Sequence, residues 1–210
     1  MTTKATASLR IEQAHPEDMR ELLELQYAAY RSEALLYHNY SIQPLTQTYE
    51  QALDDFHRYL ILKAVHQEKI IGSVRAHEKH NTVHINKLIV MPSYQNQGIG
   101  KYLMKYIESF FSDKRFELFT GGRSWLNLAL YKKLGYEIYQ EKADDTGFVF
   151  AYLTKSPAPT PVKPSNTAAP KTGGRILVQA TLQESPEERY KRLLREKGGR
   201  PRQMEPCSGG

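Results

Sequence analysis

A segment that joins a strand to a helix through two glycines constrains the fold of this chain more than any other feature. An extended run over residues 84–91 ends at Met91-Pro92, a polar turn follows, and a helix begins at Gly98-Ile-Gly100. Exposed amides at the start of a helix, together with the helix dipole, form an anion site. Glycine lets a phosphate approach the backbone without a clash against a Cβ atom. The segment therefore predicts a phosphate-binding turn, or else close packing of the helix on the strand.

Two common phosphate motifs do not fit this turn. A nucleotide phosphate loop would need glycine at position 95 and serine or threonine at position 102, where the chain has Gln95 and Tyr102. The dinucleotide fingerprint would need a third small residue where the chain has Leu103. We therefore exclude both classes of nucleotide-binding protein.

The remainder of residues 1–154 alternates extended and helical patterns around this turn. Strands are predicted over 8–14, 59–65, 70–76, 82–91, 116–119, 136–139 and 148–153. Helices are predicted from residue 16 through 30 and over 46–56, 98–111 and 124–134. The order β-α-α-β-β-β-α-β-α-β, with the last two extended runs closing as a strand pair, predicts an α/β fold: a mixed sheet with helices on both faces.

A change of composition near Thr154 divides the chain into two parts. Residues 155–210 hold 8 of the 11 prolines and carry 11 Lys and Arg against 5 Asp and Glu, whereas residues 1–154 carry 18 of each. The net charge of +6 therefore belongs to the second part. We expect a folded domain over 1–154 and a Pro/Gly-rich basic tail over 155–210, mostly disordered, with a short helix over 186–197.

Several classes of protein are excluded by composition. The chain has no run of 18 apolar residues, which a membrane-spanning helix would need, and no apolar leader follows Met1. The single cysteine, Cys207, cannot form an internal disulfide. We expect a cytoplasmic protein without a membrane partner, either a monomer or a homodimer.

The basic tail raises an alternative function. Its Lys and Arg residues after position 188 could bind RNA, the ribosome or an acidic protein, with the folded domain as a passenger. Tyr190 is the only aromatic residue among them, which equally suits a solvated extension that binds nothing.

Two motifs resemble those of one family. Gln95-Asn-Gln-Gly-Ile-Gly100 is similar to the Gln/Arg-x-x-Gly-x-Gly/Ala motif of the GNAT superfamily, the acetyl-CoA-dependent N-acetyltransferases. Asn127-Leu-Ala-Leu-Tyr-Lys-Lys-Leu-Gly-Tyr136 is similar to the closing segment of its small bacterial members. The resemblance covers residues 8–154. It implies the GNAT fold and transfer of acetyl from acetyl-CoA to a primary amine, of a small molecule or a protein, by direct attack in a ternary complex.

The resemblance also assigns residues to coenzyme A. The pyrophosphate would lie on the turn formed by Gln95, Asn96, Gln97, Gly98, Ile99 and Gly100, with Lys101 alongside. The pantetheine arm would pair with the backbone of Leu88, Ile89 and Val90, where the sheet must splay. An amide in that stretch would stabilise the thioester oxyanion. Asn127 resembles a cofactor-contacting asparagine of the family.

Two side chains are candidates for proton transfer. His84 lies six residues before Val90, where related acetyltransferases carry a Glu or His base, and Tyr131 matches the tyrosine that donates to the departing thiolate. Each also has a structural interpretation, His84 as a surface residue of the strand and Tyr131 as packing on the sheet. No metal is expected, because His77, His80 and His84 lack a carboxylate or cysteine at ligand spacing.

The acceptor site is expected beneath the first helices, which cover it in this family. Tyr30, Glu33 and Tyr37 belong to a tyrosine-rich stretch there. A slot lined by tyrosines with one carboxylate would suit a cationic or aromatic amine. The same residues could instead be ordinary half-buried packing.

Overall fold

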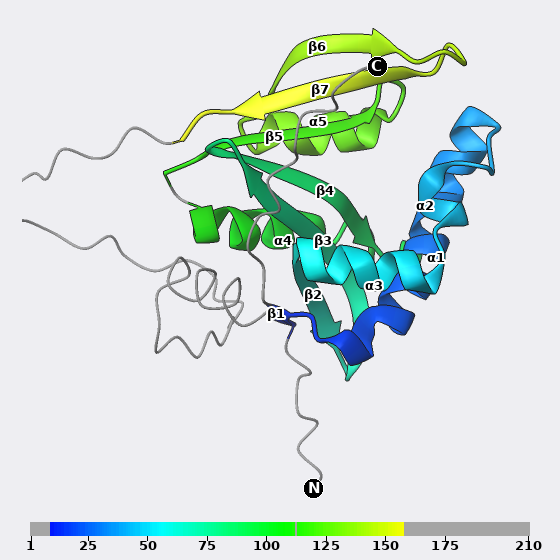
Figure 1. Ribbon diagram of the computed structural model, residues 1–210, viewed down its shortest axis with the longest axis vertical. Helices are drawn as coiled ribbons and strands as arrows, with labels where there is room; N and C mark the ends of the chain where they lie inside the picture. Colours follow the sequence, from blue (N-terminus) through cyan, green and yellow to red (C-terminus); the bar gives the residue numbers. More distant parts are fainter. Residues whose placement is uncertain (1–8, 112, 158–210) are drawn as a thin grey trace, which may run out of the picture.

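The computed structural model describes residues 9–111 and 113–157 (Figure 1). In chain order its elements are β1 (Arg10–Gln13), α1 (Met19–Tyr37), α2 (Gln43–Thr46), α3 (Tyr49–Arg58), β2 (Leu60–His66), β3 (Lys69–Lys79), β4 (Thr82–Val90), α4 (Ile99–Glu108), β5 (Arg115–Gly121), α5 (Trp125–Lys133), β6 (Glu137–Ala143) and β7 (Val149–Lys155). Short 3-10 turns lie at Pro16–Asp18, Pro92–Tyr94 and Ser109–Phe111.

The strands form one mixed sheet, which confirms the predicted α/β class. Its seven strands lie in the order β1-β2-β3-β4-β5-β7-β6. The β4–β5 pair is parallel and the others are antiparallel. The parallel pair is possible because α4 carries the chain back between the two strands.

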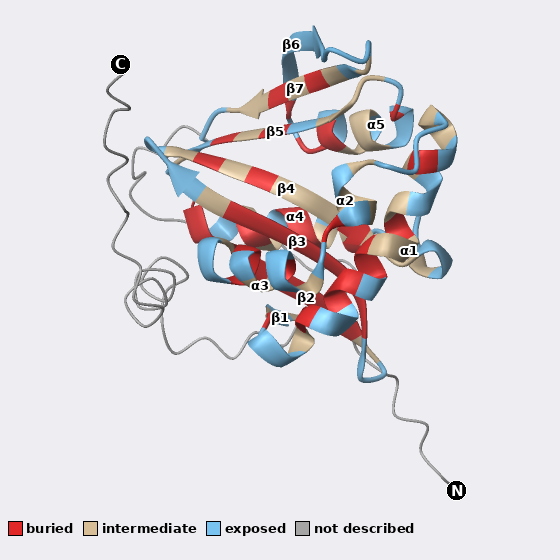
Figure 2. Cartoon of the chain, turned by 45° about the vertical axis from the view of Figure 1, so that its right-hand side comes forward, coloured by how far each residue is buried: buried red, intermediate tan, exposed pale blue. Residues whose placement is uncertain are grey.

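Helices cover both faces of the sheet, and the core has two parts. Helices α4 and α5 pack with β2–β5 and β7 around Leu103, Met104 and Ile107, which are fully buried. Helices α1 and α3 cover the other face around Leu22 and Phe56. Because β2 and β3 are covered on both sides, they are buried along most of their length (Figure 2).

Three helix boundaries show why local chemistry matters. The predicted helix over 46–56 begins only at Tyr49, because Thr48 caps it by accepting a hydrogen bond from the amide of Gln51 at 3.3 Å. A separate turn of helix, α2, precedes it and was not predicted. Helix α4 begins after Gly98 and ends at Glu108, before a 3-10 turn, so the prediction of one helix over 98–111 was too long.

The final strand pair is present as predicted, although its first strand is longer than expected. The strands predicted over 136–139 and 148–153 are β6 and β7, seven residues each, paired from Glu137 and Thr154 to Ala143 and Val149. Every residue of β6 is exposed, so the sequence pattern located only the start of this edge strand.

The predicted tail lies almost wholly outside the described residues. The helix over 186–197, the basic run and Cys207 all fall there. Strand β7 extends to Lys155, one residue past the predicted boundary at Thr154. Among residues 9–111 and 113–157, no helix is both long and apolar enough to cross a membrane.

Candidate functional site

The sheet opens between its two central strands. Strands β4 and β5 pair only from Thr82 to His84, opposite Arg115 to Glu117. Beyond that point β5 continues beside β7, while β4 continues beside β3, and the two halves of the sheet diverge (Figure 1). The splay that acetyl-CoA binding would require along residues 88–90 is therefore present, although no sequence pattern revealed it.

A β-bulge shapes the open part of β4. Residue 73 of β3 pairs with Ile89 and residue 75 pairs with Asn86, so β4 fits two residues, Lys87 and Leu88, opposite one residue of β3. Lys87 adopts the left-handed conformation, with φ of 48°, which is uncommon for a residue other than glycine.

The backbone of β4 after the bulge presents hydrogen-bonding groups to the opening. The amide of Met91 donates to the carbonyl of Ile71 at 2.8 Å, toward β3. Successive residues of a strand point their backbone amide and carbonyl groups in opposite directions, so the amide and carbonyl of Val90 point toward the opening. The carbonyl of Val90 accepts a hydrogen bond there from the side chain of Gln95, at 3.1 Å.

The glycine turn lies directly after this strand. Gly98 has φ of 83° and precedes the first residue of α4, so the chain enters the helix through a left-handed residue that glycine adopts without strain. No described residue accepts a hydrogen bond from the amides of residues 98–101. These amides, at the positive end of α4, are free to bind an anion.

The polar residues of the turn have different surroundings. The amide of Gln95 donates to the carbonyl of Pro92 at 3.3 Å, so it does not belong to the free set. The side chain of Gln97 donates to the carbonyl of Ser93 at 3.3 Å, and Lys101 is exposed on the first turn of α4.

Side chains from the C-terminal half of α1 form hydrogen bonds with residues at the start of α5. The carboxylate of Glu33 accepts hydrogen bonds from the Ser124 hydroxyl and, at 3.2 Å, from the Asn127 side chain. The Tyr37 hydroxyl accepts a hydrogen bond from the amide of Arg123 at 2.7 Å. Asn127, predicted to contact the cofactor, and Glu33, predicted to contact the acceptor, are thus brought together; the roles of both stay predictions.

Tyr131 lies buried on the inner side of α5. Burial raises the pKa of its hydroxyl above the usual value of 10.0, and the nearby Tyr30 and Glu33 raise it further. Burial likewise raises the pKa of Tyr30 to about 12. The raised pKa keeps this hydroxyl protonated at neutral pH, and no described residue accepts a hydrogen bond from it, so it can donate one to a bound group.

His84 lies at the last paired position before the opening. Its ring stacks on that of His77 with centroids 5.2 Å apart, and its Nδ1 lies 3.9 Å from a carboxylate oxygen of Glu117. Within the described residues no three His, Cys, Asp or Glu side chains are grouped as metal ligands. His80 lies in the β3–β4 turn.

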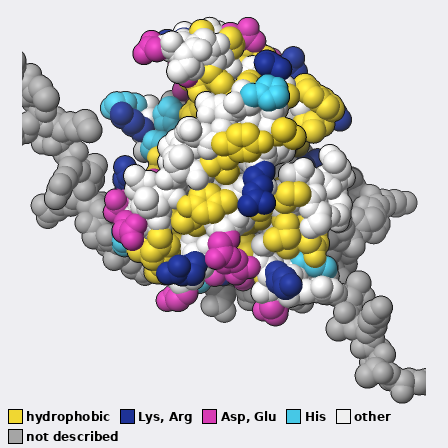
Figure 3. Space-filling model, turned by 90° about the vertical axis from the view of Figure 1, so that its right-hand side faces the viewer, with side chains coloured by type: hydrophobic (Ala, Val, Ile, Leu, Met, Phe, Trp, Pro, Cys, Tyr) yellow, Lys and Arg dark blue, Asp and Glu magenta, His cyan; other side chains and the backbone are white. Residues whose placement is uncertain are grey.

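One groove lies on a different face of α1 from the predicted acceptor residues. It measures about 450 Å³ and is lined by Tyr27, Arg31, Leu35, Tyr40 and Leu45. The face that carries α1 and α2 shows hydrophobic side chains gathered around basic ones (Figure 3). Tyr27, Arg31 and Leu35 follow a spacing of four, so they share one stripe of the helix, whereas Tyr30, Glu33 and Tyr37 form another.

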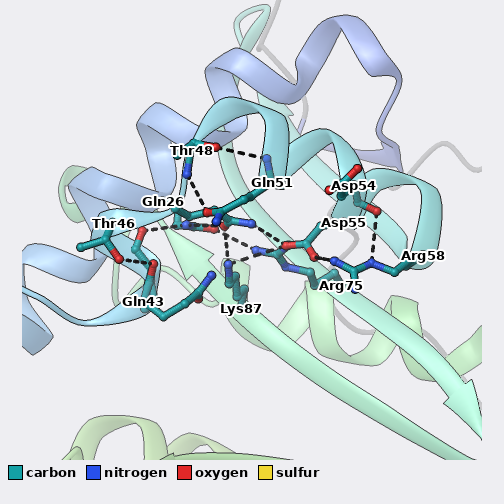
Figure 4. Close-up of polar contacts among 12 residues, drawn as sticks. Gln26, Gln43, Thr46, Thr48, Gln51, Asp54, Asp55, Arg58, Arg75 and Lys87 are labelled. Carbon is teal, nitrogen blue, oxygen red and sulfur yellow. Dashed lines mark hydrogen bonds and ion pairs between the residues drawn. The ribbon is translucent and has the colours of Figure 1, made fainter.

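A buried set of polar side chains, which sequence reasoning missed, lies between the sheet and helices α1 and α3 (Figure 4). We call it the polar cluster; its members are Gln26, Gln47, Asp55, Arg75 and Lys87. Arg75 donates to Asp55 and, at 2.8 Å, to Gln26. Gln47 accepts from Gln26 at 3.0 Å and from Lys87, and donates to Asp55 at 2.6 Å. The one available signal was Arg75, a cationic residue inside the largely apolar run over residues 70–76.

Removing Arg75 from this cluster is expected to destabilise the fold strongly. In Arg75→Met the Asp55 carboxylate stays buried without its closest cation, and the expected loss is about 3–5 kcal/mol in the free energy of unfolding. Arg58 bonds the same carboxylate at 3.1 Å but its side chain is 67% exposed, so Arg58→Met should cost less than about 1 kcal/mol. Urea denaturation measures both values, and equal losses would contradict the assignment.

The fold and motifs define a class of protein. The chain matches the Acetyltransferase (GNAT) family over residues 17–136, which is more than half of its length. The chain therefore belongs to the GNAT family.

Particular relatives support this assignment. The chain is 40% identical over 68 residues to the uncharacterized N-acetyltransferase YkwB of Bacillus subtilis (strain 168), a match that covers 32% of this chain and 29% of YkwB. It spans less than two thirds of the length of the curated relatives that it matches.

Solved structures share the fold. The PaiA N-acetyltransferase of Thermoplasma acidophilum, in complex with coenzyme A, has a TM-score of 0.59 at 19% identity and covers 69% of this chain and 98% of its own. The ribosomal-protein-S18-alanine N-acetyltransferase of Escherichia coli has a TM-score of 0.58 at 14% identity and covers 74% and 99%.

Proposed function

We propose that this protein transfers the acetyl group of acetyl-CoA to a primary amine by direct attack in a ternary complex. The observation that carries the proposal is the set of free amides of residues 98–101, placed beside the open edge of β4. An anion at the helix start and an extended arm along the strand end would then lie in one continuous opening.

Coenzyme A would bind along the free amides of the turn and the open edge of β4. The amides of Gly98, Ile99, Gly100 and Lys101 would hold the pyrophosphate, with the lysine ammonium adding charge. Asn96 and Gln97 would border it from the turn, and the Gln95 side chain would hold the end of β4 in place. The backbone of Leu88, Ile89 and Val90 would pair with the pantetheine arm, and Asn127 would approach it from α5.

The chain's own residues would position the reacting groups and move protons. Acetyl-CoA supplies an activated acetyl group, and a β4 amide would bind its carbonyl oxygen as negative charge develops there, a contribution on the order of 3 kcal/mol. Tyr131 would donate its proton to the departing thiolate. His84, which lies three residues before the bulge, stays a prediction as the base.

The acceptor would approach from the side covered by α1. One stripe of that helix carries Tyr30, Glu33 and Tyr37. Glu33 and Tyr37 form hydrogen bonds with residues 123–127, so this stripe faces the start of α5. The Glu33 carboxylate would favour a cationic amine there.

Acetyl-CoA turnover against a panel of amines tests the proposal. Release of free thiol is measured with polyamines, arylalkylamines, amino acids, and peptides with free N-termini or lysines. We expect at least one amine class to raise thiol release well above the rate of acetyl-CoA hydrolysis alone, and the class that does so separates small-molecule from protein acceptors. Thiol release that no amine accelerates would contradict the proposal.

A further inference from the structure

The bulge in β4 turns one lysine away from the core of the α4 face. Ile85 packs with Leu103 and Ile107 on that face. In a regular strand Lys87, two residues later, would point the same way. The bulge instead directs Lys87 to the face covered by α1 and α3, where its ammonium donates to the Gln47 side chain (Figure 4).

Lys87 is the most weakly paired cation of the polar cluster. Its Nζ lies 3.9 Å from the Asp55 carboxylate, which already bonds Arg75 and Gln47 and, at 3.1 Å, Arg58. Helix α1 contributes the neutral side chains of Gln26 and Tyr30 to this region. The nearby carboxylate, Asp55, comes from α3, and the competing cation, Arg75, comes from β3. The Lys87 side chain is only 13% exposed.

These surroundings favour the neutral amine of Lys87. Burial, followed by repulsion from Arg75, lowers the pKa of its ammonium from 10.5 to about 7, against the opposing effect of Asp55. A lysine in this state exchanges a proton near neutral pH, as a general base must.

Lys87 also lies next to the backbone expected to hold the thioester. It directly precedes Leu88, Ile89 and Val90 in the opened part of β4. On the face covered by α1 and α3, a cavity of about 20 Å³, room for about one water molecule, borders the side chains of Lys87 and Ile89. His84, by contrast, lies where β4 is still paired with β5.

We propose that Lys87, rather than His84, accepts the proton of the attacking amine; this rests on the proposed acetyl transfer. As the C–N bond forms, the amine proton passes to the neutral Nζ of Lys87, directly or through one water, and Gln47 accepts a hydrogen bond from the resulting ammonium. As the C–S bond breaks, the thiolate takes the proton of Tyr131. After the products leave, Lys87 releases its proton to solvent and Tyr131 regains one.

Substitutions at Lys87 separate proton transfer from mere placement of charge. Lys87→Met should lower kcat by about 100-fold or more, while affinity for acetyl-CoA stays within about 2-fold. Lys87→Arg keeps a cation near Gln47 but cannot lose its proton near neutral pH, so it should be equally slow. A positioning role would instead be rescued by arginine. The matched control is Lys63→Met, which removes another buried lysine, on β2, whose ammonium lies 2.7 Å from the Asp18 carboxylate. This variant should keep the wild-type pH profile.

The pH profile gives a second readout that leaves the lysine in place. Activity of the wild type should rise as the pH rises through the pKa of Lys87, because the Lys87 side chain accepts a proton only in its neutral form. Gln47→Glu places a carboxylate against the ammonium and should move this rise to higher pH by about one unit or more. The rise should be lost in Lys87→Met and kept in His84→Gln.

Three outcomes would overturn the proposal. A wild-type-like profile in Lys87→Met, rescue by arginine, or an unmoved profile in Gln47→Glu would each remove Lys87 as the proton acceptor while leaving the acetyl transfer intact. Absence of any amine-dependent turnover by the wild type would remove both proposals together.

Discussion

Replacing Gly98 by valine is expected to weaken coenzyme A binding about 100-fold. The backbone at this position has φ of 83°, which a β-branched residue avoids, so the turn must rearrange. Rearrangement would move the amides of residues 98–101 away from the pyrophosphate. Loss of two hydrogen bonds to a charged group, at about 1.5 kcal/mol each, corresponds to about 100-fold weaker binding.

A second glycine provides a matched control. Gly147, in the β6–β7 turn, has φ of 82°, and a Cβ atom there would meet nothing within 4 Å. Gly147→Val therefore imposes similar local strain away from the opening and should leave affinity within about 2-fold of the wild type. Isothermal titration with coenzyme A compares the two variants. Unchanged affinity in Gly98→Val would remove the turn as the pyrophosphate site.

Tyr131→Phe is expected to lower kcat about 100-fold or more with little change in the affinity for acetyl-CoA. The burial that raises the pKa of Tyr131 keeps the hydroxyl protonated throughout the neutral range, so it can donate a hydrogen bond to the thiolate that forms as the C–S bond breaks. Phenylalanine retains the ring that packs under α5 but has no proton to give. Steady-state kinetics with acetyl-CoA and the best amine of the panel measures both quantities.

Tyr136 is the control for this substitution. Its ring lies 6.0 Å from that of Tyr131, centroid to centroid, and its hydroxyl donates to Glu108 at 2.8 Å. Tyr136→Phe should cost about 1 kcal/mol of stability and leave kcat unchanged. Full activity in Tyr131→Phe, or an equal loss in both variants, would assign the thiolate proton to another group.

The part of the site that could be predicted from the sequence is local. The turn at Gly98 was predicted because a strand end, two glycines and a helix start are adjacent in the chain, and a left-handed residue there needs glycine. Tyr131 and Asn127 followed from a second short motif on one helix. The mixed sheet followed from the alternation of elements, and for the exposed edge strand β6 the sequence located only the start.

The rest depends on contacts between distant segments. The polar cluster draws one residue each from α1, the α2–α3 connection, α3, β3 and β4, and no spacing in the sequence links them. The bulge at Lys87 reverses the face of the strand, so strict alternation would have placed this lysine in the α4 core. The opening between β4 and β5 depends on where pairing stops, which the apolar pattern of either strand does not record.

The most direct test of the account is a titration of the ¹⁵N-labelled protein with coenzyme A, followed through its backbone amide resonances by NMR. We expect the amides of residues 98–101 to shift strongly and to saturate together with those of Leu88 to Val90, whereas pantetheine, which lacks the pyrophosphate, should shift only the strand resonances. Amides at 98–101 that stay unshifted at saturating coenzyme A would contradict the account.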